Sequence, residues 1–137
     1  MAVFEVRTAS RCQMLDITRQ VRQALAESGL RDGAVLVYVP HTTAGVTINE
    51  NADPSVAADI LAQLERMVPR GAGYRHGEGN SDAHIKATLT GFSQLVPVRE
   101  GSLALGTWQG VFFCEFDGPR TRRVMVSFLP AAQREEA

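Results

Sequence analysis

Three histidines are the first side chains in this 137-residue sequence whose positions suggest chemistry. His41 directly follows the apolar run 34–39, His76 lies in a glycine-rich stretch, and His84 lies where a helix is predicted to begin. None of them belongs to a periodic apolar stretch, which weakens the simplest alternative, a hydrogen-bonded histidine in the core. Imidazole nitrogens bind divalent metal ions and transfer protons near neutral pH. We therefore predict that all three histidines are metal ligands and catalytic groups of one site.

The segment 76–84, HGEGNSDAH, adds polar groups between two of these histidines. One hypothesis is that the histidines and the carboxylates Glu78 and Asp82 bind Zn²⁺, Mg²⁺ or Mn²⁺, with one coordination position left for water or phosphate. The eight-residue separation of His76 and His84 is not typical of metal ligands. A second hypothesis is that the glycines and the backbone amides after Asn80 bind an anion at the N-terminus of the following helix. A third hypothesis is a glycine loop that only turns the chain. We predict a catalytic Asp82 and a substrate-binding Asn80.

A second polar stretch, HTTAGVTINENADP, spans residues 41–54. Thr42 and Asn49 are candidate substrate-binding residues and Glu50 is a candidate catalytic residue, because ligand sites gather where a strand gives way to a loop. Asp53 has a simpler role, since Asp followed by Pro is typical of a helix start.

The segments GTWQG and DGPRTRR are the last candidates. Trp108, beside Gln109, is predicted to form an aromatic wall for a flat ring, and the alternative is packing on a sheet edge. Arg120 and Arg122 would point the same way from a strand and could hold a phosphate, and the alternative is a solvated charged strand.

The elements that must position these residues follow from periodicity and turn residues. Helices are predicted near 17–28 after Asp16, near 54–67, and after Ser81 and Asp82, with Ile85 and Leu89 on one face of the last one. The run 34–39 predicts a strand covered on both faces. Tight turns at 100–101, 109–110 and 117–120 predict hairpins between their strands. The strands are 3–8, 34–39, 94–100, 102–108, 111–117 and 121–129. We expect an α+β fold, a largely antiparallel sheet (sandwich or pseudo-barrel) with two or three helices, in a single domain 1–130 with a flexible tail 131–137.

Composition excludes several classes of protein. Fourteen Lys and Arg balance fifteen Asp and Glu, for a net charge of -1, so the basic excess of nucleic-acid-binding proteins is missing. No apolar run approaches the roughly 20 residues that cross a bilayer. Two cysteines, Cys12 and Cys114, do not form a disulfide framework, and we expect Cys114 to be a buried free thiol. With no signal sequence at the N-terminus, the expected location is the cytoplasm, with no nucleic-acid or membrane partner.

The blocks HTTAGVTINENADP, YRHGEGNSDAHIKATLTGFSQLVPV and LGTWQGVFFCEFDGPRTRR together resemble the YjbQ family, also called UPF0047. The resemblance runs from about residue 33 to the last strand. It implies a compact α+β fold and a homotrimer. Its polar motif positions in this sequence are His41, Thr42, Asn49, Glu50, Asp53, His76, Glu78, Asn80, Asp82, His84, Trp108, Gln109 and Glu115.

Some members of this family are credited with thiamine-phosphate synthase activity. The resemblance therefore implies a transferase that joins hydroxymethylpyrimidine diphosphate to thiazole phosphate with loss of pyrophosphate. Two alternatives remain open on the residues alone. One is a metal-assisted hydrolase of a small phosphorylated or amide substrate, and the other is a non-catalytic trimer that binds a metal or an anion.

Overall fold

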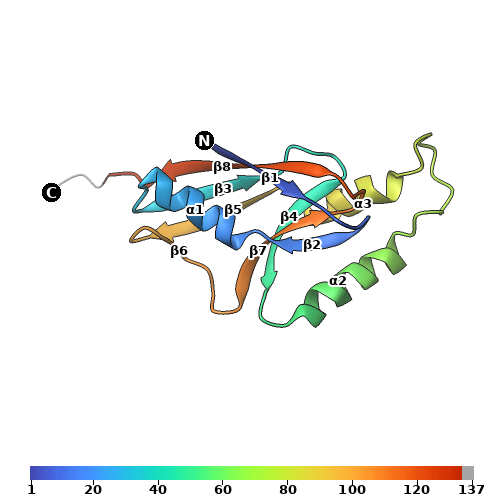
Figure 1. The fold of residues 1–137 in the computed structure, drawn as a ribbon, viewed down its shortest axis with the longest axis horizontal. Coiled ribbons are helices and arrows are strands. Elements are labelled where there is room, and N and C mark those ends of the chain that lie inside the picture. Colours follow the sequence, from blue (N-terminus) through green and yellow to red (C-terminus); the bar gives the residue numbers. More distant parts are fainter. Residues whose placement is uncertain (134–137) are drawn as a thin grey trace.

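Two antiparallel sheets and three helices make up the computed structural model, which describes residues 1–133 (Figure 1). The α+β fold expected from the sequence is confirmed. The predicted tail lies partly outside these residues, because 134–137 are not described. The helices are α1 (Thr18–Ser28), α2 (Pro54–Met67) and α3 (Ser81–Thr90). The strands are β1 (Ala2–Arg7), β2 (Gln13–Asp16), β3 (Gly33–Tyr38), β4 (Ala44–Glu50), β5 (Ser93–Arg99), β6 (Ser102–Leu103), β7 (Gln109–Glu115) and β8 (Thr121–Pro130).

Sheet A has the strand order β1-β8-β3-β5-β6, and sheet B has the order β2-β7-β4. The main core lies between the sheets and receives alternate side chains of each, such as Val35 and Val126 from sheet A and Phe113 from sheet B. Val21 and Leu25 of α1 complete it. Each such side chain contributes about 1.5–3 kcal/mol by leaving water.

A second, smaller core lies on the other face of sheet B. Phe112 and Cys114 point into it from β7, and α3 covers them with Ala83 and Ala87. Close approach of α3 depends on Gly45 of β4, since a Cβ atom there would lie 2.5 Å from the carbonyl oxygen of Gly91. Sheet B is therefore covered on both faces.

Side-chain hydrogen bonds support two of the helix starts, and the predicted cap of α2 is confirmed, whereas the N-cap of α1 is Ile17, one residue after Asp16. Asp53 Oδ1 accepts from the Ser55 N–H at 2.9 Å and caps α2. Asp16 Oδ1 accepts from the N–H and the hydroxyl of Thr18, at 2.9 and 2.6 Å, at the start of α1. Among residues 1–133 no helix combines the length and hydropathy needed to cross a membrane.

One prediction about burial is wrong. Strand β3 is covered on one face only, because Val35 and Val37 are buried whereas Tyr38 is 45% exposed on the outer face of sheet A. Ile85 and Leu89 share one face of α3, as predicted, and that face is exposed, since the helix packs through its two small alanines instead. Small side chains let the helix approach the sheet, and the larger ones then point outward.

The connections also differ from the hairpins predicted for the C-terminal half. Only the turn at Glu100–Gly101 joins a hairpin, β5–β6, and β6 is two residues long. Gln109–Gly110 begins β7 instead of forming a turn, and the 117–120 turn passes from sheet B to sheet A. The short strand β2 was not predicted. A turn sequence fixes the local bend, but which sheet the next strand joins depends on distant side chains.

Candidate functional site

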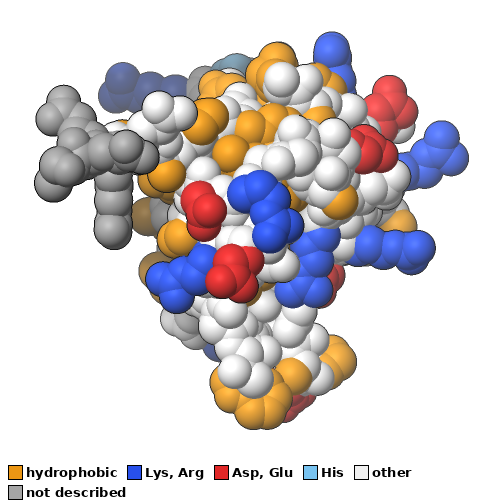
Figure 2. Space-filling model, turned by 90° about the vertical axis from the view of Figure 1, so that its left-hand side faces the viewer, with side chains coloured by type: hydrophobic (Ala, Val, Ile, Leu, Met, Phe, Trp, Pro, Cys, Tyr) orange, Lys and Arg blue, Asp and Glu red, His pale blue; other side chains and the backbone are white. Residues whose placement is uncertain are grey.

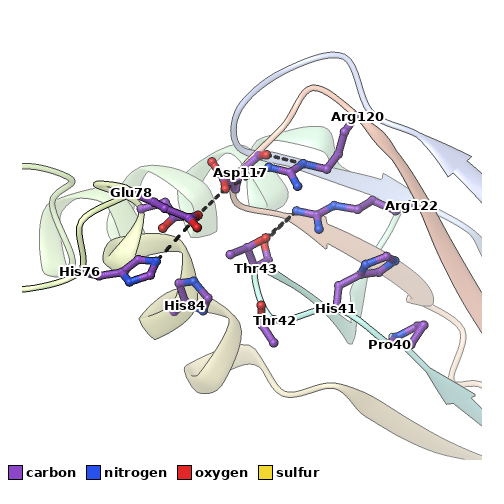
Figure 3. A pocket seen from close by; sticks show the side chains of 11 residues that line it. Pro40, His41, Thr42, Thr43, His76, Glu78, His84, Asp117, Arg120 and Arg122 are labelled. Atoms are coloured by element: carbon purple, nitrogen blue, oxygen red, sulfur yellow. Dashed lines mark hydrogen bonds and ion pairs between the residues drawn. The ribbon is translucent and has the colours of Figure 1, made fainter.

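Three connections meet at one end of the sheets and enclose a cavity of about 480 Å³ (Figure 3). They are the β3–β4 connection, the loop before α3 with the start of that helix, and the β7–β8 connection. Of the lining residues only one is apolar, so the cavity suits a small, highly polar ligand. The lining consists of Pro40, His41, Thr42, Thr43, His76, Glu78, Asn80, His84, Asp117, Arg120 and Arg122.

Strand register explains why these segments meet. In sheet B Ala44 pairs with Glu115, so residues 41–43 lie beside the start of the 117–120 turn. Helix α3 packs on the same sheet and brings the loop 76–80 to the same end. The prediction that three far-apart histidines lie at one polar hollow is therefore supported by their common cavity.

A buried ion pair forms the floor of the cavity. Glu115 and Arg122 are 0% and 3% exposed, and both Nε and Nη2 of the arginine donate to the carboxylate. Arg122 Nη2 also donates to Thr43 Oγ1 at 2.8 Å, and the Thr8 hydroxyl donates to Glu115 at 2.8 Å. Burial acts to raise the pKa of Glu115, but these hydrogen bonds and those from backbone amides outweigh it and hold the pKa below its ordinary value.

This pairing bears on the predicted phosphate clamp of two arginines. Nε and Nη2 of Arg122 are bonded to Glu115 and Thr43, so this guanidinium is held in place at the cavity and only its Nη1 has no partner among the described residues. Arg120 is different, because its side chain is 49% exposed. Its Nε and Nη2 bond Asp117, and its Nη1 has no partner among the described residues. Asp117 also accepts from Asn80 Nδ2 at 2.8 Å, which ties the α3 loop to the arginine.

His41 is half-buried, and its Nε2 accepts the backbone N–H of Arg123 at 2.9 Å. Burial lowers the pKa of His41, and the positive charge of Arg122 lowers it further. A neutral imidazole has one lone pair. That lone pair is used by Arg123, so in this arrangement His41 offers none to a metal ion.

His76 and His84 meet edge to face, with ring centroids 5.5 Å apart. His76 Nε2 lies 3.8 Å from a carboxylate oxygen of Glu78, as the dashed line in Figure 3 shows. Within residues 1–133, no three His, Cys, Asp or Glu side chains are close enough to hold a metal ion. The predicted three-histidine metal centre therefore does not fit one chain, and the divalent-ion cofactor stays a prediction.

Asp82 does not reach the cavity, although a catalytic role was predicted for it. Its carboxylate is fully buried and accepts from both terminal nitrogens of Arg11 and from Lys86 Nζ, each at 3.0 Å. Burial acts to raise the pKa of Asp82, but these bonds lower it to about 2. Asp82 therefore belongs to a structural ion network under α3.

Four other predicted residues lie at the opposite end of sheet B. Glu50 pairs with Gln109 in the register of β4 and β7, at the far end from Ala44. Seven strand residues separate their ends by about 20 Å at roughly 3.3 Å per residue. A single chain therefore does not bring the cavity together with Asn49, Glu50, Trp108 and Gln109. Trp108 is 63% exposed there.

Thr43 and Asp117 line the cavity and were not predicted as site residues. The sequence carries a signal for Asp117 only in its turn, DGPR, which suggested a bend and no chemistry. Their role becomes visible only with the register that pairs β4 with β7.

Comparisons with known proteins decide the family. The model described as UPF0047 protein YjbQ-like matches residues 2–131. The chain belongs to the UPF0047, YjbQ-like family. It is 50% identical over 126 residues to the UPF0047 protein MJ1081 of Methanocaldococcus jannaschii, covering 92% of this chain and 91% of the relative. It is 49% identical to the UPF0047 protein YugU of Bacillus subtilis, covering 94% and 98%.

Solved structures of UPF0047 proteins share the fold. An uncharacterized YjbQ/UPF0047 protein of Clostridium acetobutylicum superimposes with a TM-score of 0.93 at 51% identity, covering 94% of this chain and 100% of that one. A YbjQ-like protein of unknown function from Sulfolobus solfataricus gives 0.91 at 36% identity, covering 95% and 96%.

These comparisons overturn the functional expectation. The relatives are named only as UPF0047 proteins, and a close structural neighbour is described as of unknown function. The expectation of a thiamine-phosphate synthase, and of a transferase, was therefore wrong as an inference from family membership. The same names give no support to a hydrolase.

Proposed function

We propose that the cavity at His41, His84 and Arg120 binds a small phosphorylated molecule. The observation that carries this proposal is the convergence of an exposed guanidinium, three imidazoles and the N-terminus of α3 on one polar cavity. Guanidinium and imidazole N–H groups donate to phosphate oxygens, and a helix N-terminus favours an anion.

Arg120 is the central donor of this proposal. Its Nη1 has no partner among the described residues and its side chain is 49% exposed, so a phosphate can bind this guanidinium while the pair with Asp117 stays in place. The Glu115–Arg122 pair beneath holds Thr43 in place and gives the cavity a rigid floor. A preformed floor reduces the ordering cost of binding.

Isothermal titration calorimetry with inorganic phosphate tests the proposal. We expect binding to wild type and a loss of about tenfold or more in Arg120→Ala, because hydrogen bonds between charged groups contribute about 1.5–3 kcal/mol. Arg99→Ala is the matched control, since Arg99 is an exposed arginine at the end of β5 that lies away from the cavity. Equal affinities of wild type and Arg120→Ala would contradict the proposal.

The same titration addresses the divalent-ion prediction. Protein treated with EDTA is titrated with phosphate before and after addition of Zn²⁺, Mn²⁺ or Mg²⁺. Binding in EDTA supports direct recognition by the protein, whereas binding only with the metal supports an ion shared by His76, His84 and the phosphate.

We also propose that the protein forms a homotrimer, as the family resemblance implies. The outer face of sheet A supports self-association, because it exposes several large apolar side chains and no other element covers it within the described chain. Val3, Tyr38, Leu95 and Leu129 are 44–60% exposed on this face. Figure 2 shows hydrophobic side chains gathered along the upper part of the molecule, on the side where β8 lies. Exposed apolar patches of this kind mark interaction surfaces.

A further inference from the structure

The two ring nitrogens of His41 have different surroundings. Nε2 accepts the backbone N–H of Arg123 at 2.9 Å. Because a neutral imidazole carries one hydrogen and one lone pair, this bond places the hydrogen on Nδ1. A doubly protonated ring would put an N–H against the N–H of Arg123 and lose the bond.

The end of a strand ladder creates this bond. Strands β3 and β8 pair as far as Tyr38 and Met125, and the chain then turns away at Pro40. Arg123, two residues before Met125 in β8, has no β3 residue opposite it. The His41 ring takes that place and accepts the amide that a strand carbonyl would otherwise accept.

The charged surroundings favour the neutral ring. Arg122 and Arg123 are the nearby cations, and Glu115 is the nearby carboxylate. Glu115 is already paired with Arg122, so it gives little net attraction for an imidazolium. Burial and Arg122 both lower the pKa of His41. Burial and the charge of Arg122 therefore act in the same direction and outweigh the attraction of Glu115.

We propose that His41 is a specificity-determining donor: a neutral imidazole, fixed in the Nδ1–H tautomer by the Arg123 amide, that donates to an acceptor oxygen of the bound ligand. The contact with the ligand rests on the proposed phosphate site, whereas the tautomer rests on the fold alone. His41 then serves neither as a metal ligand nor as a proton acceptor. Proton transfer, where the ligand undergoes any, falls to His76 and His84.

Long-range ¹H–¹⁵N NMR spectra of ¹⁵N-labelled protein test the tautomer directly. Only three histidines contribute, and the His41 signals are assigned by their loss in His41→Gln. We expect a protonated Nδ1 and an unprotonated Nε2 at pH 7. An Nε2–H tautomer or a doubly protonated ring at that pH would overturn the assignment.

Two substitutions separate the nitrogens in binding. His41→Asn keeps an N–H group near the position of Nδ1, and His41→Gln keeps an acceptor near the position of Nε2. We expect His41→Gln to weaken phosphate binding about tenfold and His41→Asn to weaken it less than threefold, as loss of one hydrogen bond to an anion predicts. Thermal unfolding of both variants shows that each is folded.

The outcomes distinguish this inference from the proposed function. Equal losses of phosphate affinity in the two variants, or a larger loss in His41→Asn, would overturn the donor role. The phosphate site itself would still stand in that case, provided that the wild-type protein binds phosphate. A wild-type protein that binds no phosphate would overturn the proposed function and the ligand contact together.

Discussion

Lys86 Nζ lies 3.0 Å from Asp82 Oδ2, one helical turn away on α3, and the two side chains are 1% and 0% exposed. Arg11 joins them from the β1–β2 connection, and Glu65 of α2 accepts from the same lysine at 2.6 Å. Two cations therefore share one buried carboxylate. This network ties the β1–β2 connection and α2 to the helix that carries His84.

Asp82→Asn should destabilise the protein strongly. The substitution leaves Arg11 and Lys86 without their common counter-charge, and loss of one partner of a buried ion pair costs about 3–5 kcal/mol. Urea denaturation measures the change in the free energy of unfolding. Glu65→Gln is the control, because that carboxylate is half exposed, and its loss should cost less than about 1 kcal/mol. Similar losses in both variants would show that burial of Asp82 is not the cause.

Stability should fall in acid because of the same carboxylate. The pKa of Asp82 is about 2 in the fold against an ordinary value of 3.8, so the unfolded chain takes up a proton first as the pH decreases. The stabilisation is complete above about pH 4 and is lost as the pH falls towards 2. Glu115, whose pKa is also lowered, acts in the same sense.

Urea midpoints measured from pH 6 to pH 2 check this dependence. The slope should be shallower in Asp82→Asn than in wild type. Asp59→Asn, which changes an exposed carboxylate of α2, should keep the wild-type slope. A wild-type profile that is flat below pH 4 would contradict the linkage.

Cys114 should not react with thiol reagents while the protein is folded. Burial raises the pKa of this thiol to about 12, so very little thiolate exists at pH 8. Cys12 is half-buried, and burial also raises its pKa, so its reaction should be slow. With Ellman's reagent, Cys12→Ser should abolish the native-state reaction and Cys114→Ser should leave it unchanged. Rapid modification of folded Cys12→Ser would contradict the burial of Cys114.

Leu95→Glu should dissociate the proposed trimer. Leu95 is 60% exposed on the outer face of sheet A, and an unpaired carboxylate in an apolar interface is costly. Light scattering coupled to size exclusion should give three times the chain mass for wild type and one chain mass for the variant. Gln20→Glu, which adds the same charge on exposed α1, should stay trimeric. A monomeric wild type would remove the proposal, and a trimeric Leu95→Glu would move the interface elsewhere.

Local signals in the sequence predicted the helices well. The pair Asp53–Pro54 marked the start of α2, and the run 34–39 marked β3, because caps and strand propensities act between near neighbours. The histidines were predicted to meet; all three line one cavity, but only the rings of His76 and His84 are in contact. They reach the same cavity because each histidine lies just beyond a well-marked element.

Other features depend on partners far along the chain. Asp82 looked like a site residue from its place beside Asn80, but Arg11, 71 positions earlier, turns it into the interior. Glu50 follows His41 within one motif, yet the straight strand between them carries it to the other end of sheet B. Neither the orientation of the Asp82 side chain nor the register of β4 could be obtained from the local sequence pattern.

Helix α2 is held to the protein by few contacts. None of its residues is buried, and only Leu61 and Leu64 pack partly against the smaller core, beside the Glu65 bond to Lys86. Strand β7, in contrast, is buried from Gly110 to Glu115. Amide hydrogens of α2 should therefore exchange with deuterium through local opening, well before those of β7, so this helix detaches first while the end of the sheets that carries the cavity stays assembled.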